Sequence, residues 1–144
     1  MANDLLYVTW NSELETGNSK IDQQHEGWIA AVNNLFASIN DNKGAVEIKK
    51  TMKFLIEYTN IHFSDEEELQ IQFDYPKYKS HKQLHLDFKL MVINMSHTLD
   101  EQGATDDFIN NTCVTMGHWV INHIKKEDFK LVAHILTKEK EANN

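Results

Sequence analysis

The fold is decided by residues 59–85, TNIHFSDEEELQIQFDYPKYKSHKQLH, because this stretch holds two pairs of side chains of the kinds that bind metal ions. His62 and Glu66 are four residues apart, and so are His81 and His85. On an α-helix this spacing puts two side chains on one face, about 40° apart around the axis. Each pair therefore predicts a helix that directs two ligands to one point.

The segment between the two pairs contains a strong signal for the end of a helix. Asp74-Tyr75-Pro76 includes the only proline in the chain. Proline interrupts a helix because it has no N–H to donate and its ring clashes with the preceding turn. The stretch therefore predicts two antiparallel helices joined by a turn.

The composition favours one helical domain and excludes several classes of protein. The chain has 144 residues, 41% of them hydrophobic, with five glycines and one proline, which favours helices around one sizeable core over a β fold. The net charge of −8 and the lack of a Lys/Arg cluster argue against nucleic acid and against an anionic membrane as partners. Cys113 is the only cysteine, which excludes a disulfide framework and the usual multi-cysteine zinc or iron–sulfur sites.

The N-terminus and the hydropathy predict where the protein works. MANDLLYVTWNSELE has no basic region followed by an apolar run, so we expect no signal peptide. No apolar stretch approaches the ~20 residues that span a bilayer. We therefore expect a cytoplasmic protein without membrane insertion.

The apolar periodicity predicts an all-α fold: an antiparallel up-down-up-down four-helix bundle with an N-terminal arm and a short C-terminal helix. Apolar residues recur at intervals of three and four, which marks the inward face of a helix in a bundle. The second helix is the clearest case, with an inward seam of Ile48, Met52, Leu55, Thr59, His62, Glu66 and Leu69. The expected single domain, residues 1–144, comprises an arm over about 1–18 and helices over about 19–40, 45–72, 78–100, 106–124 and 129–140.

The spacing between His123 and Asp128 does not fit a regular helix. Five residues turn an α-helix by roughly 500°, which leaves the two side chains about 140° apart. For both to reach one site the helix must loosen or end between them, so we predict a break near Lys125.

Seven polar residues fall on the predicted inward faces, where the pattern calls for apolar side chains. A lone histidine in such a place is usually a core residue with a hydrogen-bond partner, whereas an unpaired buried carboxylate costs several kcal/mol. Five histidines and two carboxylates from four helices instead call for a shared partner, which a metal centre supplies. The seven are His25, His62, Glu66, His81, His85, His123 and Asp128. The other histidines, His97, His118 and His134, are expected at the surface.

The number and type of these ligands favour two redox-active metal ions. A single zinc ion takes about four ligands, and calcium and magnesium prefer oxygen to imidazole. Two six-coordinate first-row ions offer roughly twelve positions, of which the histidines, two bridging carboxylates and a bridging oxygen from solvent fill about eleven. The position that remains suits a small diatomic ligand.

This ligand pattern resembles that of the hemerythrin family, and in particular of its bacterial members. The family's signature is a histidine on the first helix, His-x3-Glu on the second, His-x3-His on the third and His-x4-Asp on the fourth. It matches IDQQH with His25, HFSDE with His62 and Glu66, HKQLH with His81 and His85, and HIKKED with His123 and Asp128. Trp10, Gly17 and Asp22 in the arm are also placed as in the bacterial members, so the resemblance covers essentially the whole chain.

The resemblance implies a four-helix bundle with two iron ions per chain in an oxo- or hydroxo-bridged, non-haem di-iron centre. One iron would be bound by His81, His85 and His123 and the other by His25 and His62, with Glu66 and Asp128 as bridges. Dioxygen would bind reversibly at the iron with two histidines. Because no substrate would be consumed, the resemblance implies an oxygen carrier, store or delivery module rather than an enzyme, with no catalytic residue.

Reversible binding requires a dry pocket, because water and protons would release the oxygen as a reduced species. We expect the wall of this oxygen pocket to include Trp28, Met116, Trp119 and Val120, although ordinary core packing also explains these residues, Met116 above all. Family members commonly carry a leucine at the position of Val120, and the smaller side chain would enlarge the pocket. Glu67 is a candidate partner of a ligand, and a solvated charge explains it equally well.

Three other functions stay open at this point. The chain could be an oxygen or redox sensor, although no output domain is evident. It could be an enzyme that reduces peroxide or nitric oxide or oxidises substrates, although such di-iron enzymes are richer in carboxylates. Iron storage is the third. An oxygen-consuming enzyme is the expected recipient of the oxygen, and the lack of a large exposed apolar stripe favours a monomer.

Overall fold

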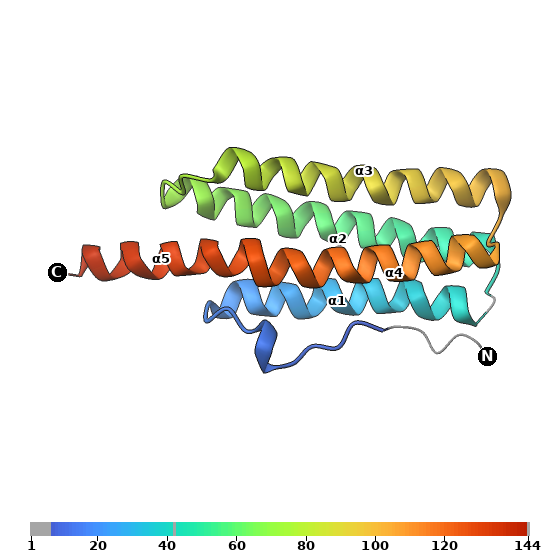
Figure 1. The fold of residues 1–144 in the computed structure, drawn as a ribbon, viewed down its shortest axis with the longest axis horizontal. Helices are drawn as coiled ribbons and strands as arrows, with labels where there is room; N and C mark the ends of the chain where they lie inside the picture. The colour runs from blue at the N-terminus through green and yellow to red at the C-terminus, as the bar shows by residue number, and fades with distance from the viewer. Residues whose placement is uncertain (1–6, 42, 144) are drawn as a thin grey trace.

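Four long helices pack side by side in the computed structural model, which describes residues 7–41 and 43–143. They are α1 (Ser19–Asn40), α2 (Ala45–Gln72), α3 (Tyr78–Gln102) and α4 (Asp106–His123). Successive helices run in opposite directions, and within the described ranges there is no strand (Figure 1). The predicted all-α four-helix bundle is therefore confirmed. The first six residues of the expected arm, Asn42 and Asn144 lie outside the described residues.

The described part of the arm runs beside α1 (Figure 1) and is hydrogen-bonded to it at two points. The backbone of Val8 exchanges two hydrogen bonds with the Asn33 side chain, at 2.9 and 2.8 Å. Further along, after the 3-10 turn η1 (Ser12–Leu14), the Asp22 carboxylate accepts from the backbone and hydroxyl of Thr16 at 2.9 and 2.8 Å. Asp22 therefore holds the arm against the start of α1, the helix that carries His25.

The helix starts and the α2–α3 turn follow from local side-chain chemistry. The side chains of Asn18 and Thr105 each accept a backbone N–H of the first turn, at 3.0 Å in both cases, and so cap α1 and α4. Between α2 and α3, Asp74 adopts a φ of 51°, which aspartate tolerates better than most residues. The Tyr75 N–H then donates to the Gln70 carbonyl at 2.8 Å, which closes the turn before Pro76.

The fourth helix does not break near Lys125; it widens. α4 passes into a π-helical turn, η2 (Ile124–Asp128), and then into α5 (Phe129–Ala142), and the three form one continuous rod in Figure 1. The Phe129 N–H bonds the Ile124 carbonyl, five residues back. A π turn takes up one extra residue without interrupting the backbone hydrogen bonds, which is why loosening replaces the predicted break.

The core is mostly aromatic and aliphatic, and it corrects two details of the sequence analysis. The next buried position after Glu66 on α2 is Gln70, which is 0% exposed, while Leu69 is only half-buried. An ideal α-helix has 3.6 residues per turn, so a seam drawn with alternating spacings of three and four drifts off the buried face over the roughly six turns from Ile48 to Leu69. His134 was also expected at the surface, but it is half-buried and its Nε2 donates to the Phe73 carbonyl at 2.7 Å.

None of the helices in the described part of the chain is both long and apolar enough to cross a membrane.

Candidate metal centre

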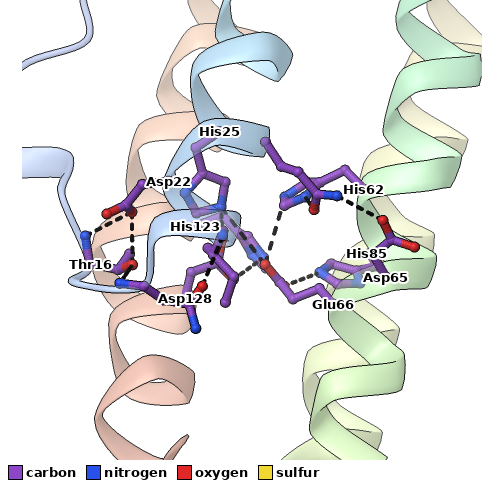
Figure 2. Close-up of polar contacts among 12 residues, drawn as sticks. Thr16, Asp22, His25, His62, Asp65, Glu66, His85, His123 and Asp128 are labelled. Atoms are coloured by element: carbon purple, nitrogen blue, oxygen red, sulfur yellow. Dashed lines mark hydrogen bonds and ion pairs between the residues drawn. The ribbon is translucent and has the colours of Figure 1, made fainter. Parts of the chain in front are cut away.

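All seven predicted ligands point into the middle of the bundle. Six of them are at most 1% exposed and His123 is 4% exposed. Figure 2 labels six of the seven, which come from α1, α2, α3 and the α4–η2 segment and lie close together around the Glu66 and Asp128 side chains. The structure thus brings together residues that the chain spreads from position 25 to position 128.

The ligand atoms form two overlapping groups that share both carboxylates. Within each group, all ligand atoms lie within 4.8 Å of one another. The first group has five members, Glu66, His81, His85, His123 and Asp128, and the second has four, His25, His62, Glu66 and Asp128. The arrangement therefore offers two adjacent metal positions with unequal numbers of ligands.

Each carboxylate turns one oxygen to each group. Glu66 Oε1 lies 3.0 Å from His81 Nε2 and 3.2 Å from His85 Nε2. Glu66 Oε2 instead faces the second group, 3.8 Å from His25 Nε2 and 3.7 Å from His62 Nε2. Asp128 divides its oxygens in the same way, with Oδ1 3.0 Å from His81 Nε2 and Oδ2 2.8 Å from His25 Nε2. Both carboxylates are thus oriented to bridge.

The two carboxylates control the protonation of the site. Burial alone opposes protonation of His25 and His81, but the adjacent carboxylates of Asp128 and Glu66 outweigh it and raise the pKa of His25 to about 9 and that of His81 to about 10. Burial also opposes ionisation of Glu66 and Asp128, but the surrounding histidines hold the pKa of both carboxyls well below the usual range. For His62 burial prevails and lowers the pKa to about 4.

This set of donors fits a pair of first-row transition metal ions. Imidazole nitrogens with carboxylates suit iron and its neighbours, while an oxygen-only cage for calcium or a thiolate site is not built here. Buried histidine nitrogens and carboxylate oxygens such as His62 Nε2 and both oxygens of Glu66 have no hydrogen-bond partner among the described residues. Unpartnered buried groups of this kind are costly, and metal ions would satisfy them together.

The comparison with known protein families decides the affiliation. The family model described as the hemerythrin HHE cation binding domain matches residues 16–135. The chain belongs to the hemerythrin family. The match includes α1 to α4 entirely and all seven residues of the site.

Named hemerythrins from animals and bacteria are similar to this chain over most of its length. A myohemerythrin from Theromyzon tessulatum is 29% identical over 121 residues, covering 84% of this chain and 88% of the relative. A bacteriohemerythrin from Stenotrophomonas maltophilia (strain R551-3) is 30% identical over 121 residues, or 84% of this chain and 76% of the relative. Another from Pseudomonas aeruginosa (strain LESB58) is 27% identical over 124 residues, covering 86% and 78%.

The hemerythrin site is lined on one side by aromatic rings, of which Trp28 and Trp119 were predicted from the sequence. Trp28 is fully buried, lies 5.3 Å from the His62 ring and donates its indole N–H to Thr59 at 3.0 Å. Trp119 is half-buried and stacks on His123 at 4.5 Å. Phe63, not anticipated because it lies one position off the seam, stacks on His85 at 3.7 Å with an angle of 3° between the rings. Met116 and Val120 are fully buried in the same core cluster, and their place in an oxygen pocket stays a prediction.

Two hydrogen-bonding partners of the histidines lie behind the ligands. Glu67 Oε2 accepts from His85 Nδ1 at 2.8 Å, so Glu67 is not merely a solvated charge. Gln24 Oε1 lies 2.9 Å from His62 Nδ1 and was missed, because a glutamine beside His25 in IDQQH carries no signal that separates it from Gln23. Only the packing of α1 against α2 reveals that it reaches a ligand.

Two further polar groups are buried on the α5 side of the site. Gln70 is 0% exposed, and neither atom of its carboxamide has a hydrogen-bond partner among the described residues. The Tyr75 hydroxyl is likewise unpartnered there, and burial, together with Glu127 and the two carboxylates of the site, raises its pKa to about 12. Tyr75 packs with Ile21 and three residues of α5 in a second, smaller core cluster, Leu131, Val132 and Ile135.

Proposed function

We propose that the protein binds dioxygen reversibly at a pair of iron ions and serves as an oxygen carrier, store or delivery module. One observation carries the proposal: the two groups of candidate ligands share both carboxylates, but the first group has five residues and the second has four. If each ion is six-coordinate and a solvent oxygen bridges them, the first ion is saturated and the second has one open position. Ferrous ions at these positions would supply the electrons and the binding place for dioxygen.

The side chains around the site favour binding over catalysis. His62 Nε2 and His25 Nε2 define the side of the open position, and Trp28 lies against both rings, at 5.3 and 6.2 Å. Trp28, Phe63 and Phe88 are fully buried and pack edge-to-face on one another, so they exclude water from that side. Water and protons are what would convert bound oxygen into a released, reduced product. We extend the proposal to Met116, Trp119 and Val120 as further walls of the oxygen pocket.

Delivery of oxygen to an oxygen-consuming enzyme by a monomeric protein completes the proposal. The similarity to proteins named bacteriohemerythrin and myohemerythrin over most of the chain supports the oxygen-binding part of the proposal. Sedimentation of the iron-loaded protein tests the monomer.

An optical cycle tests the function. The iron-loaded protein is reduced without air, oxygen is admitted and then removed under vacuum. We expect a visible band that appears with oxygen, disappears under vacuum and returns over repeated cycles. Immediate passage to the ferric spectrum would instead indicate a redox enzyme or sensor, and fewer than two irons per chain would refute the proposed centre.

Two histidine variants give the cycle a matched control. His62→Ala removes a ligand of the four-membered group, so we expect the band to be lost along with one of the two irons. His97→Ala changes an exposed histidine on α3, so both the iron count and the cycle should match those of the unmodified protein. A reversible band that survives in His62→Ala would contradict the assignment of the open position.

A further inference from the structure

Gln24 links a ligand histidine on α2 to a carboxylate on the same helix. Its Oε1 lies 2.9 Å from His62 Nδ1, and its Nε2 donates to Asp65 Oδ2 at 2.7 Å. Gln24 and Asp65 are half-buried, whereas His62 is 1% exposed. Figure 2 shows Asp65 beyond His62, on the side away from the carboxylates of the site. This series of hydrogen bonds therefore runs from Asp65, at the outer edge of the bundle, through Gln24 to His62 in the site.

Asp65 fixes the direction of both hydrogen bonds in this series. An ionised carboxylate can only accept, so the amide of Gln24 must turn its NH2 toward Asp65 and its oxygen toward His62. The amide oxygen can only accept as well, so His62 must carry its proton on Nδ1. His62 Nε2 is then left with its lone pair facing the site, as a metal ligand requires. Asp65 thus determines the tautomer of a histidine that it does not touch.

The corresponding histidine of the other ligand group has a different partner. His85 Nδ1 donates directly to the Glu67 carboxylate at 2.8 Å. An imidazole that donates to a carboxylate is a stronger ligand than one that donates to a neutral amide, because the negative charge draws on the N–H proton. A stronger ligand stabilises ferric over ferrous iron and so lowers the reduction potential. The four-membered group, with its open position, therefore has the weaker of these two histidine donors.

We propose that Gln24 and Asp65 are positioning residues, which hold His62 in its metal-facing tautomer and keep it a weaker donor than His85. The iron with the open position would then have a higher reduction potential than it would have with a histidine that donates to a carboxylate. This inference rests on the proposed function, because it takes His62 as a ligand of that iron. It assigns a role in tuning the centre to two residues that are not ligands.

An exchange of the two side-chain types tests the proposal most sharply. The double variant Gln24→Glu with Asp65→Asn keeps the overall charge and nearly the same shape, and it preserves both hydrogen bonds. It places the carboxylate at position 24, where it accepts directly from His62 Nδ1. Gln24→Leu removes the hydrogen bonds to both His62 and Asp65. Gln23→Leu, at an exposed neighbouring position on α1, is the matched control.

Iron release to a chelator and the midpoint potential of the iron centre are the measurements, and neither requires oxygen. We expect the exchange variant to keep two irons and to have a lower midpoint potential than the unmodified protein. In Gln24→Leu, one of the two irons should bind about ten- to a hundredfold more weakly. Gln23→Leu should leave both quantities unchanged.

The outcomes separate this proposal from the proposed function. An unchanged or higher potential in the exchange variant, or unchanged iron binding in Gln24→Leu, overturns the role of Gln24 and Asp65. Loss of iron from the exchange variant overturns it as well. If the unmodified protein holds two irons but does not bind oxygen reversibly, only the proposed function fails. The midpoint potentials of the unmodified protein and the exchange variant still measure how strongly His62 donates to iron. Fewer than two irons in the unmodified protein overturns both.

Discussion

His25 Nε2 and Asp128 Oδ2 lie 2.8 Å apart, although His25 is on the first helix and Asp128 is in the π turn η2 that follows the fourth. Asp128 reaches His25 because it is the last residue of the π turn, which accommodates the five-residue spacing from His123. On a regular helix the two side chains would diverge by about 140°. The extra residue of η2 thus places the second shared carboxylate.

Insertion of an alanine between Lys125 and Lys126 should therefore remove iron. It lengthens the spacing between His123 and Asp128 to six residues, whereas a π turn takes up only one extra residue, and a one-residue change in register rotates the helix after it by about 100°. Because α5 rotates as well, the variant Asp128→Asn, which keeps the register, separates loss of the ligand from misplacement of α5. We expect fewer than two irons per chain by metal analysis in both. Insertion of an alanine after Lys140, near the end of α5, is the control, and two irons retained after the insertion beside Lys125 would contradict the role given to η2.

The metal-free protein should be most stable near pH 6.5. The raised pKa values of His25 and His81 mean that the charged forms stabilise the fold below 6.5, and this contribution is lost as the pH rises through about 9 to 10. The lowered pKa values of Glu66 and Asp128 contribute stability that is present above about 4.5 and lost in more acidic solution. His62, with a pKa lowered to about 4, adds stability above 6.5 that is lost as the pH falls to 4.

Urea unfolding of the metal-free protein between pH 4 and pH 10 measures this dependence. The free energy of unfolding should decrease on both sides of the maximum. Iron loading should remove the alkaline decrease, because metal ions replace the protons that bind between the histidines and the carboxylates. A metal-free stability that stays level from pH 7 to pH 10 would show that the carboxylates do not hold protons on His25 and His81.

Gln70→Leu should stabilise the protein. Gln70 is fully buried and its amide has no hydrogen-bond partner among the described residues, which costs about 1–3 kcal/mol. A leucine is similar in length and has no polar atom to satisfy, so we expect the free energy of unfolding to rise by about 1–2 kcal/mol. Gln72→Leu, at an exposed position on the same helix, should change it by less than about 0.5 kcal/mol. A decrease for Gln70→Leu would mean that the amide is satisfied in solution.

Gly27→Ala should destabilise the protein, although alanine is the better helix former by about 1 kcal/mol. A Cβ at Gly27 would overlap the Tyr58 hydroxyl and lie 2.7 Å from the ring carbon that bears it. Tyr58 is held in place because its hydroxyl donates to the Gln24 carbonyl at 3.0 Å. Overpacking costs about 1–3 kcal/mol, so we expect a net loss of about 1–2 kcal/mol on thermal or urea unfolding.

A second substitution identifies the cause of this loss. Tyr58→Phe in the Gly27→Ala background removes the overlapping hydroxyl and should recover part of the lost stability. Glu26→Ala, at the exposed neighbouring position, should have little effect. A stabilising Gly27→Ala would show that α1 and α2 separate without penalty.

The sequence by itself determined the bundle and the composition of the site. Spacings of three and four recur from α1 to α4, and hydrophobic burial is strong enough that such a pattern specifies helices and their inward faces. His62, Glu66, His81 and His85 were readable because a polar residue on an inward face has to be compensated. The conflict between a five-residue spacing and a helical period pointed in the same way to an irregular turn before Asp128.

Only the tertiary structure decided how the seven candidate ligands are divided and what lies behind them. The division into groups of five and four depends on which oxygen of Glu66 and of Asp128 faces which histidines, and this follows from the packing of helices rather than from spacing along one of them. Gln24 reaches His62 across the contact between α1 and α2, where Gly27 leaves room for the Tyr58 side chain. Periodicity reports which face of a helix is buried. Contacts between side chains on different helices depend on the distance and rotation between those helices, which no single helix encodes.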